Sequence, residues 1–146
     1  MNVKIAESDA ELARISDVLL ELRGSFTKEA LIAQIKAQQQ AGYRVAYLES
    51  AGKVLCVAGF VIGTKLAWGK HLYVDDLVTT ERHRSAGAGK RMLDWLKAHA
   101  LAQGCRQLQL DSGVQRFGAH RFYLREGFHI SSHHFAITDL DASKST

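Results

Sequence analysis

Two glycines stand among basic side chains at the start of a predicted helix. The stretch from Arg84 to Lys90 contains Gly87 and Gly89, and it follows a predicted strand that ends near Thr79. Glycines let the backbone approach a ligand closely, and the unpaired amides at a helix start lie at the positive end of the helix dipole. The spacing therefore predicts an anion site, for which phosphate is the typical ligand.

Two familiar phosphate-binding loops do not fit this stretch. A Walker A loop needs a glycine five residues before the Gly-Lys pair and Ser or Thr after it, but Arg84 and Arg91 occupy those positions. A Rossmann fingerprint needs a small residue three positions after Gly89, where Met92 stands, and it opens a parallel β–α–β unit. The glycines therefore belong to another kind of anion site.

Composition narrows the classes of protein that can carry this site. The chain has 146 residues and a net charge of +4, with 47% hydrophobic and 23% charged residues, as expected for one globular domain. No apolar run reaches the roughly 20 residues of a membrane-spanning helix, and no signal peptide is visible, so a cytoplasmic protein is predicted. Cys56 and Cys105 fit no metal spacing and are expected to be buried thiols, and the histidines predict no metal site either.

Periodicity predicts the elements that would position the glycines. Helical spacing follows a capping box at Ser8, a cap at Thr27, the glycine stretch itself, and Phe117. Alternating or β-rich segments predict strands over residues 3–6, 43–49, 54–62, 72–79, 108–110, 128–130 and 135–140. The antiparallel meander from 43 to 79 fits a mixed α+β sheet and excludes a strictly alternating parallel fold.

With the elements in this order, the chain resembles the GNAT superfamily of acyl-CoA-dependent N-acetyltransferases. The resemblance rests on Asp-Leu-Val-Thr before the glycine stretch, on Arg84-x-x-Gly87-x-Gly89, and on Phe122-Tyr123-x-x-x-Gly127-Phe128. It implies a three-layer α/β/α fold, in which about four helices flank a mostly antiparallel twisted sheet. Residues 1–140 are then expected to form one acetyltransferase domain, followed by a frayed tail over 141–146.

The resemblance also implies how acetyl-CoA would bind. The amides around Ser85 to Lys90 would hold its pyrophosphate, and Arg84 matches the basic position that opens the motif. Backbone groups of the preceding strand would pair with the pantetheine arm and steady the thioester carbonyl. The cofactor-binding residues implied in this way are Leu77, Val78, Thr79, Arg84, Ser85, Ala86, Gly87, Ala88, Gly89 and Lys90.

Proton transfer needs an acid and a base. Tyr123 matches the family tyrosine that protonates the departing thiolate, and a phenol with a reference pKa near 10 suits that task; outside its Gly127-Phe128 context it would be read as a core aromatic residue. The base could be Asp75, Asp76 or Asp111, and Asp76 is slightly favoured. Since side chains alternate along a strand, Asp75 and Asp76 reach one cleft only if a bulge intervenes. Each carboxylate could instead order water or bind a cationic acceptor.

The resulting hypothesis is an enzyme that moves the acetyl group of acetyl-CoA to a primary amine of a small molecule or peptide by direct attack, without a metal. Arg116 stands where many family members have Asn, so that residue's usual role in binding the cofactor arm does not carry over. The alternative is a non-catalytic acyl-CoA-binding regulatory module. Nucleic-acid and membrane partners are not expected, because no stacking aromatic residues interleave with the basic ones. A homodimer, common in the family, is left open.

Overall fold

The computed structural model describes residues 1–81 and 86–141, which form two compact units with a boundary between Leu110 and Asp111. The first unit carries a five-stranded sheet with strand order β1-β2-β3-β4-β5. Its strands are β1 (Asn2–Ile5), β2 (Arg44–Ser50), β3 (Lys53–Lys65), β4 (Gly69–Thr79) and β5 (Gln107–Leu110). Its helices are α1 (Asp9–Leu22), α2 (Lys28–Gln39) and α3 (Ala88–Ala102). The second unit contains the helix α4 (Phe117–Arg125).

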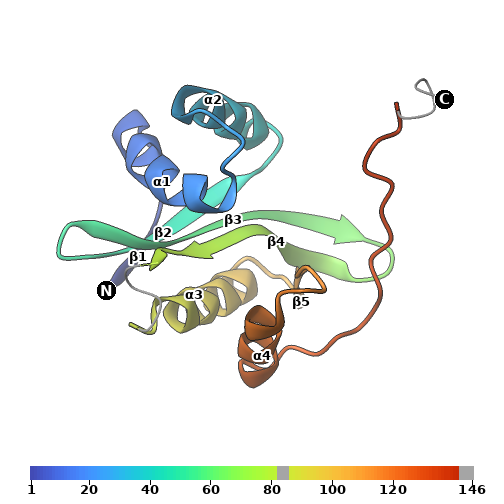
Figure 1. Ribbon diagram of the computed structural model, residues 1–146. Coiled ribbons are helices and arrows are strands. Elements are labelled where there is room, and N and C mark those ends of the chain that lie inside the picture. The colour runs from blue at the N-terminus through green and yellow to red at the C-terminus, as the bar shows by residue number, and fades with distance from the viewer. Residues whose placement is uncertain (82–85, 142–146) are drawn as a thin grey trace. The chain divides into compact units, whose positions relative to one another are not determined.

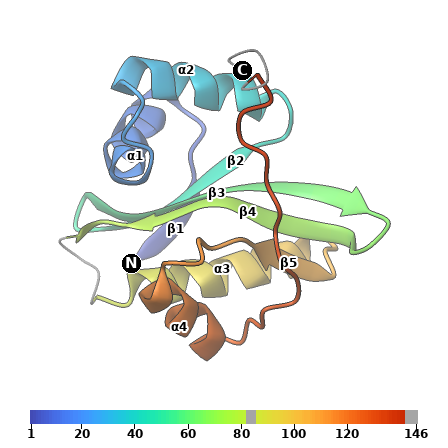
Figure 2. The same cartoon turned by 45° about the vertical axis from the view of Figure 1, so that its right-hand side comes forward.

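The sheet separates two layers of helices. α1 and α2 cover one face, and α3 covers the opposite face (Figure 1), an arrangement that stays clear in the rotated view (Figure 2). β1 to β4 pair antiparallel, whereas β5 runs parallel to β4. The predicted mixed α+β class and the antiparallel meander are confirmed.

Each face of the sheet buries its own apolar cluster. On the side of α1 and α2, Leu12, Ile15 and Leu31 pack with side chains of the sheet such as Val57. On the side of α3, Met92, Leu93 and Leu96 are fully buried, and Phe60 of β3 meets the ring of Trp95 edge-on at 6.2 Å. Each buried side chain of this size contributes roughly 1.5–3 kcal/mol, so both layers are firmly anchored on the sheet.

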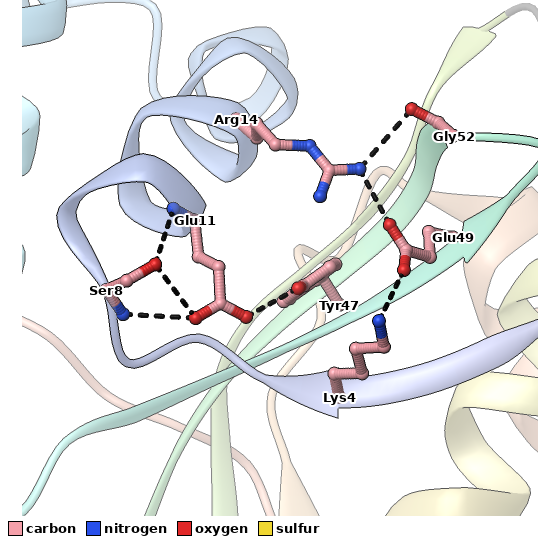
Figure 3. Close-up of polar contacts among 7 residues, drawn as sticks. All are labelled: Lys4, Ser8, Glu11, Arg14, Tyr47, Glu49 and Gly52. Atoms are coloured by element: carbon pink, nitrogen blue, oxygen red, sulfur yellow. Dashed lines mark hydrogen bonds and ion pairs between the residues drawn. The ribbon is translucent and has the colours of Figure 1, made fainter.

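A capping box fixes the start of α1 and ties it to β2. Ser8 Oγ accepts a hydrogen bond from the Glu11 amide at 3.1 Å, and Glu11 Oε1 accepts one from the Ser8 amide at 3.0 Å (Figure 3). The Tyr47 hydroxyl donates to Glu11 Oε2 at 2.5 Å. Led by the Tyr47 bond, these contacts lower the pKa of Glu11 from 4.5 to about 2. Next to this cluster, Lys4 and Arg14 both pair with Glu49 (Figure 3).

Both cysteines are buried thiols, as predicted. Cys56 lies on β3 and Cys105 precedes β5, and neither forms a disulfide. Loss of hydration raises the pKa of Cys56 to about 11, because the thiolate is disfavoured where water is excluded. Among the described helices, none is long and apolar enough to cross a membrane.

The prediction of two further strands near the C-terminus is wrong. Residues 128–130 and 135–140 contain no strand, and Phe135 and Ile137 are 90% and 80% exposed. The alternation of apolar residues indicated strands, but a strand is stable only when a neighbouring strand satisfies its backbone groups. In the described part of the second unit, α4 is the one regular element. The tail expected over 141–146 lies outside the described residues, apart from Asp141.

Candidate functional site

The start of α3 has the backbone geometry expected of an anion site. Gly87 caps the helix in the left-handed region, at φ 78°, where a residue with a Cβ would be strained. The first intrahelical bond runs from the Arg91 amide to the Gly87 carbonyl at 3.1 Å, so the amides of Ala88 and Gly89 precede it and have no partner within the helix. No acidic residue lies in the first turn, and Gly87 itself has no side chain to cap the helix.

The structure describes only some of the other residues of the glycine stretch. Ala86 is exposed, and Lys90 forms an ion pair with Asp94 at 3.0 Å, one turn along α3. Arg84 and Ser85, which were also predicted to bind the cofactor, lie outside the described residues. The site at α3 is therefore described by its backbone from residue 86 onward.

β4 offers an open backbone edge beside this helix start. Its pairing with β5 covers only four residues, from His71 opposite Gln107 to Val74 opposite Leu110. Residues 76–79 pair with β3 on one side, but no strand of the described chain pairs with their other edge. The predicted cofactor-contacting residues Leu77, Val78 and Thr79 lie on this open stretch. Unpaired amides and carbonyls on a strand edge can bind an extended ligand.

A bulge begins the open stretch and brings two carboxylates to one face. Gly59 of β3 pairs with Asp76, and the next residue, Phe60, pairs with Val74, so Asp75 is inserted without a partner. An extra residue shifts the alternation of side chains by one position. Asp75 and Asp76 consequently line the same pocket of about 220 Å³, on the side of α1 and α2. The sequence analysis stated that Asp75 and Asp76 could reach one cleft only if a bulge intervened, and this bulge meets that condition.

Asp76 is fully engaged by neighbouring side chains. Arg23, at the end of α1, forms an ion pair with it at 2.8 Å through Nη2 and donates from Nε at 2.9 Å. The Tyr43 hydroxyl donates to its other oxygen at 2.6 Å. Burial and the Asp76 carboxylate together raise the pKa of Tyr43 far above its usual range, so the hydroxyl remains a donor. Gly59 makes room for this ring, because a Cβ at Gly59 would overlap the Tyr43 hydroxyl.

Asp75 differs from its neighbour in its contacts. Among the described residues its carboxylate has no hydrogen-bond or ion-pair partner, although Arg23 Nη2 reaches its backbone carbonyl at 3.2 Å. Partial loss of hydration, followed by the nearby Asp76 charge, raises the pKa of Asp75. A carboxylate with a raised pKa and a vacant lone pair is better suited to accept a proton than one held in an ion pair.

Tyr123 and Asp111 belong to the second unit, which is described by itself. Tyr123 lies on α4, where its ring contacts Phe122 and meets Phe128 edge-on at 5.7 Å. Asp111 lies 3.5 Å from Nδ1 of His134. These ring contacts are the ones that the interpretation of Tyr123 as a core aromatic residue predicts, and the roles of Tyr123 as acid and Asp111 as base stay predictions.

The sequence analysis missed three residues of the pocket. Arg23 lies at the end of α1, Tyr43 directly before β2, and Gly59 on β3, and no local pattern marks them as neighbours of Asp76. One signal was present, because a glycine inside a β-rich run often marks a close approach of another group. Gly59, within the run from 54 to 62, marks the place where the Tyr43 ring crosses β3.

Comparison with known proteins agrees with this arrangement. Residues 12–128 match the model of the acetyltransferase (GNAT) family. The chain belongs to the GNAT acetyltransferase family. It is 33% identical over 137 residues to YhdJ, an uncharacterised N-acetyltransferase of Bacillus subtilis, an alignment that covers 92% of this chain and 96% of the relative. The family and this relative identify the protein as an N-acetyltransferase.

Solved structures of acetyltransferases share the fold. A putative acetyltransferase from Agrobacterium tumefaciens superposes with a TM-score of 0.81 at 22% identity, covering 94% of this chain and 99% of the other. An aminoglycoside N-acetyltransferase in complex with CoA superposes with a TM-score of 0.80 at 13% identity, covering 93% of each chain. The GNAT fold implied by the sequence motifs is confirmed.

Proposed function

We propose that this acetyltransferase transfers the acetyl group of acetyl-CoA directly to a primary amine, within one domain formed by residues 1–140. The observation that carries the proposal is the bulge at Asp75, because it places a carboxylate with a raised pKa at the beginning of the open edge of β4. An amine bound at this carboxylate would lie beside an acyl donor extended along that edge.

The start of α3 and the edge of β4 would hold acetyl-CoA. Amides from Ser85 to Lys90, helped by the Arg84 side chain, would bind the pyrophosphate at the positive end of the helix dipole. Backbone groups of Leu77, Val78 and Thr79 would pair with the pantetheine arm. The left-handed cap at Gly87 and the absence of acidic residues in the first turn of α3 fit a diphosphate, and CoA in a structural neighbour with the same fold supports this assignment.

The proton transfers would involve one carboxylate and one phenol. An ammonium group must lose a proton before it can attack, and Asp75 would accept that proton, directly or through water. The C–N bond would then form at the thioester carbon and the C–S bond would break. Tyr123 would give its proton to the departing thiolate and would regain one from the nitrogen, which loses its second proton as the amide forms. Asp76 would serve in positioning, since its oxygens are already occupied by Arg23 and Tyr43.

Calorimetric titration with CoA, followed by a thiol-release assay with acetyl-CoA and a panel of amines, tests this proposal. Binding of CoA with amine-dependent thiol release is expected. Binding without thiol release would favour the regulatory acyl-CoA-binding module, and no binding at high micromolar CoA would overturn both functions.

A further inference from the structure

The pocket that contains Asp75 has walls of distinct chemical character. Its apolar side is formed by Leu19 of α1, Phe26 in the connection to α2, and Leu31 and Ile35 of α2. Leu19, Leu31 and Ile35 are buried, whereas Phe26 is partly exposed. Methylene groups of a ligand would be removed from water on this side, at roughly 0.8 kcal/mol for each buried CH₂.

The polar side of the pocket carries an uncompensated negative charge. Its titratable groups are Arg23, Tyr43, Asp75 and Asp76. The Arg23 guanidinium pairs with the Asp76 carboxylate and donates to the Asp75 backbone carbonyl. The Tyr43 hydroxyl donates to Asp76. The Asp75 carboxylate is what the pocket still offers to a ligand. It attracts a cation and repels an anion, and among the described residues that line the pocket no uncommitted cation offsets that repulsion.

The size of the pocket limits the acceptor. Its volume of about 220 Å³ is smaller than the roughly 300–1,000 Å³ of sites for drug-sized ligands. Gln34 and Gln38 line the same pocket and are bonded to each other, from Nε2 to Oε1 at 2.9 Å. These amides can form hydrogen bonds with a ligand but carry no charge, so they do not neutralise an anionic group.

We infer that the pocket takes the acceptor as a short aliphatic primary amine that carries no anionic group. The ammonium group binds at Asp75, beside the open edge of β4, and the alkyl stem lies against Leu31 and Ile35. This inference rests on the proposed function and narrows its substrate class. The opposite case, an acceptor that carries a carboxylate or a phosphonate, is one of the outcomes of the test.

The test is a matched panel of primary amines assayed by thiol release from acetyl-CoA. Butylamine and putrescine represent the inferred class, and γ-aminobutyrate and aminopropylphosphonate add an anionic end to a chain of similar length. We expect kcat/KM for the first two to exceed that for the anionic pair at least tenfold. Equal or better use of either anionic amine would overturn the inference while leaving the proposed function intact.

A binding experiment tests the amine preference of the pocket independently of acetyl transfer. Calorimetry of butylamine against γ-aminobutyrate, with the protein alone and with saturating CoA, should give tighter binding of butylamine. If no amine releases thiol, the proposed function fails and this comparison alone decides the inference. Tighter binding of γ-aminobutyrate, or no binding of either amine, would then overturn it.

A variant should weaken the preference for the amine that lacks an anionic group. Asp76→Asn leaves Arg23 without its carboxylate partner, so the ratio of kcat/KM for butylamine over γ-aminobutyrate should fall at least tenfold. Asp9→Asn is the matched control, because it removes a carboxylate that pairs with Lys36 away from the pocket, and it should leave the ratio unchanged. An unchanged ratio in folded Asp76→Asn would contradict the charge argument. If that variant does not fold, the panel on the natural protein still decides.

Discussion

Replacing Glu11 by glutamine should remove most of the pH-dependent part of the unfolding free energy that the start of α1 contributes. Glu11 accepts hydrogen bonds from the Ser8 amide, the Glu7 amide and the Tyr47 hydroxyl. Together they lower the pKa of Glu11 from 4.5 to about 2. One pKa unit corresponds to about 1.4 kcal/mol, so the ionised side chain stabilises the fold by about 3–4 kcal/mol at most, and by less where solvent screens the charge.

The pH dependence has a definite sign. The pKa of Glu11 is lower in the folded protein than in the unfolded chain, so its contribution is fully present above about pH 4.5 and is lost as the pH falls through 2. In urea unfolding, Glu11→Gln should therefore cost about 1–3 kcal/mol at pH 7, and the difference from the natural protein should shrink to less than half by pH 3. Tyr47→Phe, which removes the bond that lowers this pKa most, should weaken the same pH dependence.

Glu29→Gln is the matched control, because Glu29 also lies in the first turn of a helix but is exposed. It should cost only the roughly 0.3–1 kcal/mol of a favourable charge at a helix start. A loss for Glu11→Gln that equals the Glu29→Gln loss, or that is the same at pH 7 and pH 3, would refute the assignment of this stability to the capping box and Tyr47.

Four further substitutions test the site. Tyr123→Phe should lower kcat about a hundredfold with nearly unchanged acetyl-CoA affinity by calorimetry; an unchanged kcat would remove it from the acid role. Gly87→Glu should weaken CoA binding at least tenfold, since it adds bulk and negative charge at the proposed diphosphate site; normal affinity would contradict that site. Asp75→Asn should lower kcat about a hundredfold at unchanged KM for acetyl-CoA, whereas a retained kcat would exclude it as the base. Gly59→Ala should displace Tyr43 and cost about 1–3 kcal/mol in urea unfolding, and a neutral effect would contradict the close packing.

The sequence predicted correctly those features that are determined by residues close together in the chain. The capping box at Ser8, the cap at Thr27 and the glycine at the start of α3 each act within one helical turn, and the structure has all three. The predicted strands over 128–130 and 135–140 failed because a strand depends on a partner that its own residues do not specify.

The pocket could not be predicted for a related reason. Arg23 lies 53 residues before Asp76 in the chain, and Tyr43 lies 33 residues before it. Nothing in the spacing of three such distant residues indicates that they meet. The alternation rule did identify the condition under which Asp75 and Asp76 would share a face, and the inserted residue in β4 meets that condition.

The bulge in β4 also makes the pocket sensitive to the number of residues in the strand, and not only to their type. Removing Asp75 would restore regular pairing with β3 and leave the other residues of β4 on their present faces, because Val74 already pairs with Phe60 and Asp76 with Gly59. The pocket would then keep Asp76 and lose its second carboxylate. Removing Leu77 would instead keep the bulge but turn the residues on one side of the deletion to the opposite face, so the position of a deletion in this strand decides its effect.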